Sequence, residues 1–210
     1  MTTTNVQSGD GRLRRGRRTR EQLLRAAVEL FGSKGFAATS MKDLAASAGV
    51  RAPAIYNHFV SKDHVLAAAL VWVLEEFRSQ VLDHDDPSEP ALSRLENLVR
   101  RHVHFQAEHS TMVRAADALI QSVITEKWLT PEDREEVRAL LDAYREVLAV
   151  IVEDLRSQVV IDLPATTFCV PAIIALCDQA PSWQRQDDGT LGAEVADACW
   201  SLVAGMLRQT

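Results

Sequence analysis

Residues 40–59 constrain the fold more than any other part of the chain, because they place two short helix-like runs on either side of one glycine. Ser40 followed by Asp43 is typical of a helix N-terminus, with a capping hydroxyl and an acid in the first turn. Gly49 ends that helix, and a second short run carries Ile55 inward. Two short helices joined by a tight glycine turn predict a helix-turn-helix motif.

The spacing within this motif combines three physical limits. Ala45 is small enough for the second helix to cross closely, and Gly49 can adopt the left-handed conformation that the turn needs. Ile55 would fill the angle between the two helices. Pro53 is acceptable only in the first turn of the second helix, where its missing N–H costs nothing.

The second helix is expected over 51–59, roughly 12 Å at 1.5 Å per residue, which suits a DNA major groove about 12 Å wide. Ile55 and Phe59 would face inward, which leaves Arg51, Ala52 and Asn57 to face base edges. Arginine pairs well with guanine and asparagine with adenine. The stretch therefore predicts a nucleic-acid reading helix.

Other polar residues near this helix are predicted to hold phosphate. They are Thr39, Ser40, Tyr56, His58 and Lys62. Tyr56 could instead be half-buried core, and His58 a structural histidine. Arg17 and Arg18, at the end of an arginine-rich arm, could lie in the adjacent minor groove.

The charge distribution supports this prediction although the net charge of -6 does not. Residues 1–60 carry ten Lys or Arg against four Asp or Glu, whereas residues 61–210 carry thirteen against twenty-five. Residues 12–20 alone hold six arginines. Such asymmetry indicates a basic binding head on an acidic body, although a charge run can also be a solvated tail.

The rest of the chain predicts helices throughout. Residues 1–16 lack periodicity and are expected to form a flexible basic arm. Beyond the breaker "DHDDPSEP", helices are expected at roughly 90–108, 111–128, 130–158, 164–181 and 190–208. The fold class is all-α, with about nine helices.

Several function classes lack support in the sequence. No apolar stretch is long enough to span a membrane, and no secretory signal is visible, so a cytoplasmic location is expected. No phosphate loop, nucleophile elbow or metal motif appears, so neither enzymatic activity nor a cofactor is expected. His102 and His104 would lie about 200° apart on a helix and cannot share one ion. Cys169 and Cys177 would lie about 12 Å apart on a helix, too far for a disulfide.

Residues 19–70 resemble the TetR family of bacterial transcriptional regulators. The resemblance rests on "TREQLLRAAVELFGSKGFAATSMKDLAASAGVRAPAIYNHFVSKDHVLAAAL", with the family's "TS", "LA", "AGV", "YxHF" and "SK" elements. The chain departs from the family's habits at Arg51, Ala52, Pro53 and Asn57. These positions are predicted to face outward, so they are expected to set this chain's own operator sequence.

The resemblance implies a homodimer in which each subunit has a DNA-binding domain at 17–77 and a helical ligand-binding and dimerisation domain at 78–210. It also implies a double-stranded DNA operator and a repressor released by a small molecule. The body is similar to a subgroup that regulates fatty-acid, steroid or acyl-CoA catabolism, so a hydrophobic or acyl-CoA-type effector is expected.

Apolar residues with a few polar anchors are expected to line the effector site. The candidates are His102, Phe105, Met112, Arg114, Trp128, Tyr144 and Trp183. Small residues in the last two helices, such as Ala175, Ala198 and Gly205, predict a four-helix interface between two subunits. Two alternatives remain open: an enzyme or carrier with a vestigial head, and a redox or metal sensor.

Overall fold

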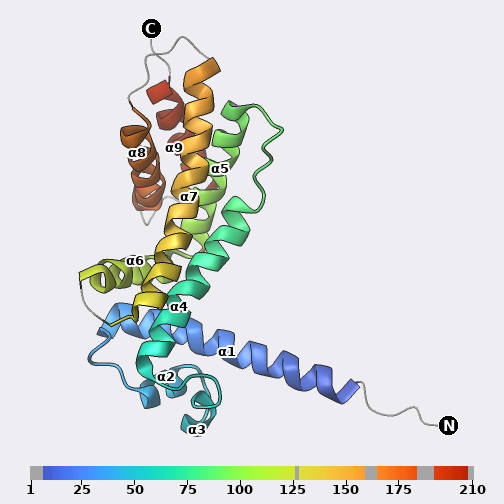
Figure 1. The fold of residues 1–210 in the computed structure, drawn as a ribbon, viewed down its shortest axis with the longest axis vertical. Coiled ribbons are helices and arrows are strands. Elements are labelled where there is room, and N and C mark those ends of the chain that lie inside the picture. Colours follow the sequence, from blue (N-terminus) through green and yellow to red (C-terminus); the bar gives the residue numbers. More distant parts are fainter. Residues whose placement is uncertain (1–6, 126–127, 159–164, 184–191, 208–210) are drawn as a thin grey trace, which may run out of the picture. The chain divides into compact units, whose positions relative to one another are not determined.

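The computed structural model describes residues 7–125, 128–158, 165–183 and 192–207, and these residues form helices and turns without a strand. Nine α-helices appear in this part of the chain, which confirms the all-α prediction (Figure 1). They are α1 (Gln7–Lys34), α2 (Met41–Ser47), α3 (Ala52–Ile55), α4 (Lys62–Phe77), α5 (Ala91–Glu108), α6 (Ser110–Thr125), α7 (Pro131–Gln158), α8 (Thr166–Gln179) and α9 (Gly192–Leu207). None of these helices is long and apolar enough to cross a membrane.

The chain divides into two compact units. The head unit comprises Met1–Val73 together with Thr111–Glu135, and the body unit comprises Leu74–Ser110 together with Glu136–Thr210. The expected boundary near residue 77 placed all of 111–135 in the body. The head unit is therefore built from two separate stretches of sequence.

Helix α1 begins at Gln7, so residues 7–16 are helical where an irregular arm was expected. Arginine and leucine favour helices, and no proline interrupts the chain between residue 7 and the strongly periodic part of α1. The helix can therefore extend upstream despite glycines, each of which costs about 1 kcal/mol relative to alanine. The arginine-rich stretch lies on this helix.

Local signals in the head unit act as predicted. The Ser40 hydroxyl accepts a hydrogen bond from the Asp43 N–H at 3.2 Å, and the Asp43 carboxylate accepts one from the Ser40 N–H at 2.9 Å, which completes a capping box for α2. Gly49 has a φ of 68°, the left-handed conformation expected for the turn into α3. Leu44, Ala45 and Ile55 are buried at this turn.

Helix α6 packs against α1 within the head unit at an unusually close distance. A Cβ atom placed on Gly32 would lie 2.3 Å from the Ala115 Cβ and 2.6 Å from the Ala115 Cα. Trp128, which follows α6, stacks on Phe36 with ring centroids 4.8 Å apart. These contacts explain why 111–135 belongs to the head unit.

The body unit is a helical bundle in which α5 packs against both α8 and α9. Figure 1 shows α5, α7, α8 and α9 running side by side in this unit. The last turn of α4 belongs to this unit and continues directly into a π-helical turn, Arg78–Leu82. Leu95, Leu98 and Val99 of α5 are fully buried and form the centre of the core.

Candidate nucleic-acid interface and candidate effector site

The reading helix is shorter than predicted. Regular helix covers only Ala52–Ile55, where an extent of 51–59 was expected. Hydrogen bonds from the N–H groups of Asn57 and His58 to the carbonyls of Ala54 and Ile55 carry the chain on as helical turns. Most of the shortening is at the C-terminal end, because only one residue, Arg51 with its extended backbone, is lost at the start.

The outward-facing residues of this segment are solvent-exposed as predicted. Ile55 and Phe59 are buried and attach the segment to the head unit. The exposed set consists of Arg51, Ala52, Pro53, Tyr56 and Asn57, while His58 is half-buried. Tyr56 has 59% of its surface exposed, so it is not a core residue in this structure.

Thr39 and Lys62, both predicted to contact phosphate, form hydrogen bonds inside the head unit. The Thr39 side chain is buried, and its hydroxyl donates to the Gly35 carbonyl at 2.8 Å. The Lys62 ammonium donates to the Phe36 carbonyl at 2.8 Å and lies 4.3 Å from the centre of the Phe36 ring. Both groups stabilise the turn after α1. Ser40 stays at the surface, although its hydroxyl already serves the α2 cap.

The Ser40 cap also affects the acid beside it. Hydrogen bonds from the Ser40 hydroxyl and N–H lower the pKa of the Asp43 carboxyl, and Lys34, 3.6 Å away, lowers it further. A negative charge is therefore kept at the N-terminus of α2.

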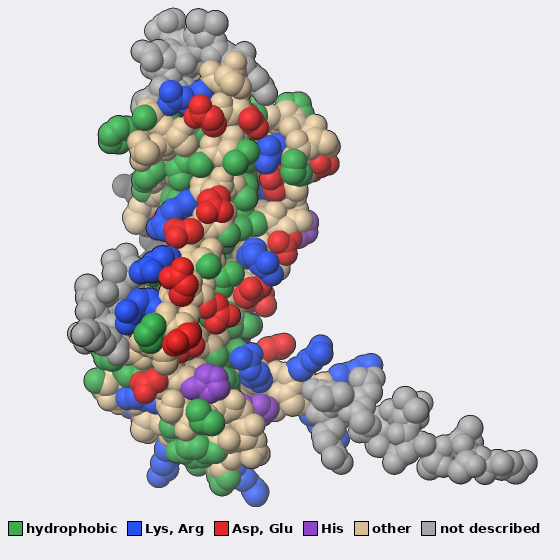
Figure 2. Space-filling view, in the orientation of Figure 1, with side chains coloured by type: hydrophobic (Ala, Val, Ile, Leu, Met, Phe, Trp, Pro, Cys, Tyr) green, Lys and Arg blue, Asp and Glu red, His purple; other side chains and the backbone are tan. Residues whose placement is uncertain are grey.

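The basic residues of α1 lie at its surface. Arg17 and Arg18 are exposed, whereas Arg20 places its guanidinium 5.5 Å from the centre of the Phe59 ring. Lys and Arg side chains gather along the described part of α1 in Figure 2. Arg20 thus links the arginine-rich helix to the reading segment through a cation–π contact.

Three of the predicted effector residues meet in the body unit. Phe77 lies at the centre, with ring centroids 4.9 Å from His102, 5.2 Å from Phe105 and 5.0 Å from Tyr144. Each pair meets edge to face, the arrangement that aromatic rings prefer. Phe77 was not among the predicted residues, and it is half-buried in the structure.

Polar contacts hold this aromatic cluster in place. The Tyr144 hydroxyl lies 2.8 Å from the His102 Nδ1, and the His102 Nε2 lies 3.1 Å from the Asp178 carboxylate. Gln106 donates to the same carboxylate oxygen at 2.8 Å. All these contacts are satisfied when Tyr144 donates to Nδ1 and the Nε2–H donates to Asp178. Burial raises the pKa of Tyr144 well above 10, so its hydroxyl stays neutral.

The other four predicted effector residues are distributed over both units. Met112, Arg114 and Trp128 belong to the head unit, and Arg114 is exposed. Trp183 sits in a short 3-10 turn and has 41% of its surface exposed. These four residues therefore stay predictions for the effector site.

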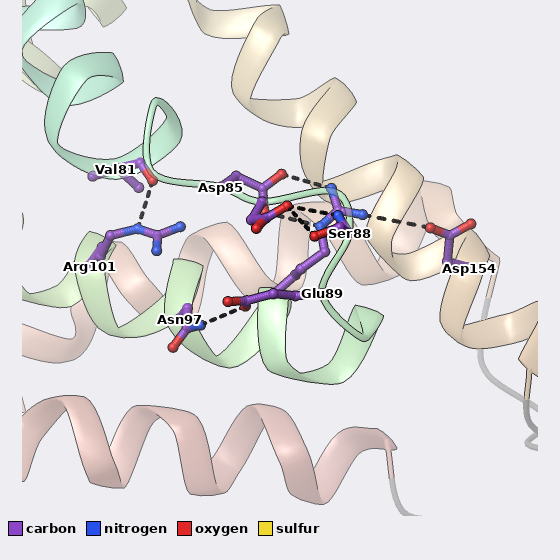
Figure 3. A network of polar contacts seen from close by, with 9 residues as sticks. Val81, Asp85, Ser88, Glu89, Asn97, Arg101 and Asp154 are labelled. Atoms are coloured by element: carbon purple, nitrogen blue, oxygen red, sulfur yellow. Dashed lines mark hydrogen bonds and ion pairs between the residues drawn. The ribbon is translucent and has the colours of Figure 1, made fainter.

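Two arginines of α5 that the sequence reasoning missed form a polar network at the start of the body unit (Figure 3). Arg94 is buried and forms an ion pair with Asp85 at 2.7 Å and another with Asp154 at 3.8 Å. The Arg101 Nε donates to the Val81 carbonyl at 2.9 Å. In the sequence, only their position beside the buried leucines of α5 indicated that these arginines could be partly buried.

All three cysteines are buried, and none of them forms a disulfide among the residues that the structure describes. Cys177 of α8 and Cys199 of α9 hydrogen-bond through their thiols, and this contact together with burial raises the pKa of Cys177. Burial also raises the pKa of Cys169. The helix spacing excluded a Cys169–Cys177 pair but could not reveal the contact between Cys177 and Cys199.

Two family models match the chain. Residues 23–69 match the N-terminal domain of the bacterial regulatory proteins of the tetR family, and residues 88–207 match a tetracyclin repressor-like C-terminal domain. The second match covers more than half of the chain.

Curated relatives match mainly over part of the chain. The HTH-type transcriptional repressor KstR2 of Mycobacterium tuberculosis is 35% identical over 83 residues, which is 38% of this chain and 40% of the relative. The HTH-type transcriptional regulator TcmR of Streptomyces glaucescens is 35% identical over 77 residues, 36% of this chain and 34% of the relative. Each alignment thus spans less than half of the relative's length.

Solved structures match over nearly the whole chain. The TetR family transcriptional regulator PfmR from Thermus thermophilus has a TM-score of 0.72 and 26% identity, and the match covers 89% of this chain and 99% of PfmR. AibR, solved in complex with isovaleryl coenzyme A and operator DNA, has a TM-score of 0.73 at 20% identity, covering 88% and 97%. The ketosteroid regulator KstR2 of Mycobacterium tuberculosis has a TM-score of 0.74 at 19% identity, covering 91% and 95%.

Proposed function

Because the chain belongs to the TetR family of bacterial regulatory proteins, we propose that it is a cytoplasmic DNA-binding repressor that releases its operator when a small molecule binds. The repression and the response to a ligand are inferred for the whole protein. The head unit would bind the operator, and the aromatic cluster of the body unit would bind the small molecule.

The observation that carries the proposal is the exposed reading segment of the head unit. Buried Ile55 and Phe59 hold the segment, while Arg51 and Asn57 present long polar side chains outward. Arginine and asparagine are the side chains that best discriminate guanine and adenine in the major groove. Ala52 and Pro53, which lie between Arg51 and Asn57 in the sequence, have small side chains that let the backbone approach the bases. The exposed arginines of α1 add positive charge for the phosphates.

The effector is proposed to be a hydrophobic or acyl-CoA-type molecule. In the body unit, the rings around Phe77 offer an apolar surface, and His102, Tyr144 and Asp178 add fixed polar groups. Apolar walls with a few convergent polar groups are typical of small-molecule sites. Two structural neighbours support this class, because AibR was solved with isovaleryl coenzyme A and KstR2 is described as a ketosteroid regulator.

A homodimer is proposed to form through α8 and α9. Large apolar side chains are exposed on these helices, at Phe168 (71%), Leu202 (51%) and Met206 (39%). Ala198 and Gly205 are exposed on the α9 face that carries Leu202, so a second helix could approach closely. Exposed apolar residues in such numbers favour a buried interface in the assembled protein. Two heads in one dimer would read two half-sites.

DNA binding can be tested with the purified protein and the DNA upstream of its own gene. Fluorescence anisotropy should show tighter binding to this DNA than to a shuffled sequence of equal composition. The logarithm of the affinity should fall with the logarithm of salt concentration, with a slope of about -0.9 per phosphate contacted. Equal affinity for both DNAs at moderate salt would refute the proposal.

Two arginine variants separate base reading from general charge. Arg51→Ala should reduce the preference for the specific DNA, by about 1–3 kcal/mol if Arg51 forms a bidentate contact with a guanine. Arg145→Ala is the matched control, since Arg145 is an exposed arginine on α7 paired with Asp142. It removes the same charge from the body unit and should leave both affinities unchanged.

The effector and the dimer need separate measurements. A thermal-shift screen with acyl-CoAs and apolar metabolites should find compounds that raise the Tm, because a ligand that binds only the folded state stabilises it. Hits should then dissociate the DNA complex. Light scattering should give twice the mass of one chain, and Phe168→Asp should reduce it to one chain.

A further inference from the structure

Arg101 of α5 uses only part of its guanidinium group. Its Nε donates to the Val81 carbonyl at 2.9 Å, but its Nη2 is buried and has no hydrogen-bond partner among the residues that the structure describes. Burial lowers the pKa of Arg101, although the group remains charged near neutral pH. A buried donor without an acceptor is destabilising and uncommon, so this nitrogen requires an explanation.

The carboxylates near Arg101 are already engaged by other donors. Asp85 and Glu89 act on the Arg101 charge, but Asp85 receives two hydrogen bonds from Arg94, at 2.7 and 3.1 Å. Glu89 accepts a hydrogen bond from Asn97 at 3.2 Å. Figure 3 shows these contacts together with the hydrogen bond between Arg101 and Val81. The open Nη2 is therefore available to an acceptor from outside the chain.

The residues around this nitrogen indicate what kind of molecule would carry the acceptor. Arg101 precedes His102 on α5, and its charge acts on the buried hydroxyl of Tyr144. Tyr144 packs against Phe77, which also contacts Phe105. An apolar molecule with one acceptor oxygen would match this combination of aromatic rings and a single open donor.

Arg101 also holds the end of the helix that enters the head unit. Val81 lies in the π-helical turn Arg78–Leu82, which continues from α4, and α4 begins at Lys62 in the head unit. π-helical turns within helices are rare and occur frequently at functional sites. Any movement of the guanidinium would change the hydrogen bond that supports this turn.

We propose that Arg101 binds the effector and transmits its presence to α4. The Nη2 donates to a carboxylate or thioester carbonyl oxygen on an otherwise apolar ligand, and the resulting shift of the guanidinium alters the contact between Nε and the Val81 carbonyl. The inference rests on the proposed function, because it requires a small molecule that controls DNA binding. It adds the ligand's polar group and the residue that recognises it.

Three probes of equal chain length test the recognition step in the full-length protein: decanoate, decanoyl-CoA and decanol. Isothermal titration should show that at least one of the two carbonyl-containing probes binds about tenfold or more tightly than decanol, the effect expected of a hydrogen bond to a charged group. The two carbonyl probes distinguish a free acid from a thioester. Equal binding of all three, or no binding of any, would overturn the proposal.

Variants of α5 then assign the preference to Arg101. Arg101→Met should bind all three probes alike, whereas Arg100→Met should retain the preference. Arg100 is the adjacent arginine and a matched control, since it pairs with Glu96 and Asp197 on α5 and α9. An unchanged preference in a folded Arg101→Met would overturn the proposal.

Arg101→Lys tests the second step and also serves if Arg101→Met does not fold. Lysine keeps the charge and the aliphatic stem but has no Nε–H for Val81 and no second nitrogen. It should therefore bind the preferred probe but release DNA at least fivefold less efficiently than the original protein. Normal release by Arg101→Lys would refute the role of the Val81 contact. Failure of the unsubstituted protein to bind or release DNA would instead refute the proposed function.

Discussion

Gly32→Ala provides a direct test of the close contact between α1 and α6. An added Cβ would lie 2.3 Å from the Ala115 Cβ and 2.6 Å from its Cα, and real Cβ atoms essentially never approach other heavy atoms within 3.0 Å. Because one of these atoms is backbone, α6 or α1 must move. Overpacking of this kind costs about 1–3 kcal/mol. Against it stands a gain of roughly 0.5–1 kcal/mol from replacing glycine in a helix.

Gly16→Ala is a matched control on the same helix. A Cβ on Gly16 would meet nothing within 4 Å, so this change should only add the helix-propensity gain of about 0.5–1 kcal/mol. The difference between the two variants isolates the overpacking cost, about 1–3 kcal/mol. For a chain of this size, each kcal/mol should shift the Tm by about 2–4 °C.

Urea unfolding and thermal melting would measure both variants side by side. Adding Ala115→Gly to Gly32→Ala should restore little stability, because the Ala115 Cα itself lies 2.6 Å from the added atom. If Gly32→Ala stabilised the protein as much as Gly16→Ala, the close contact of α1 with α6 would be refuted.

Three further perturbations follow from contacts described above. Arg94→Leu should destabilise the protein by about 3–5 kcal/mol in urea unfolding, because it leaves the buried Asp85 carboxylate unpaired. Ser40→Ala should cost about 1 kcal/mol through loss of the α2 cap. The pKa of Asp43 is lowered in the folded protein, so its contribution to stability is present above the unfolded pKa of 3.8 and is lost as the pH falls through the folded value. In an acid titration, Ser40→Ala should therefore lose less stability over this pH range than the original protein. A thiol reagent at pH 7 should label the three buried cysteines slowly until denaturant is added.

Local rules explain the parts of the fold that could be predicted. Ser40 with Asp43 identified the start of α2, and Gly49 identified the left-handed turn, because each depends only on neighbouring backbone. Thr130 caps α7 by the same local rule, because its hydroxyl accepts the Asp133 N–H at 3.1 Å. Helical periodicity located α5 to α9 within a few residues.

Contacts between distant residues were not predictable from spacing. Helical geometry shows which residues share a face of one helix, but it does not show which helix covers that face. The pairing of His102 with Asp178, 76 positions apart, therefore had no local signal. For the same reason, the sequence did not show that Met112 and Trp128 belong to the head unit.

The role of Lys62 illustrates a further limit of sequence reasoning. A lysine beside a reading helix resembles a phosphate ligand, and its flexible stem also lets the ammonium reach the Phe36 carbonyl in the preceding turn. Charge type and position did not indicate this contact. The exposed set around Arg51 was predictable because burial of Ile55 and Phe59 determines which face is left.

Because the head unit is built from two separate stretches of sequence, it limits where the protein can be divided or fused to another protein. A fragment ending near residue 77 would lack 111–135, so the Gly32 face of α1 and the Phe36 ring would lose Ala115 and Trp128. Transplanting this head onto the body of another regulator would therefore require moving α6 and the residues after it as well. The DNA-reading part is one structural module encoded in two pieces, and exchange by a single crossover would break it.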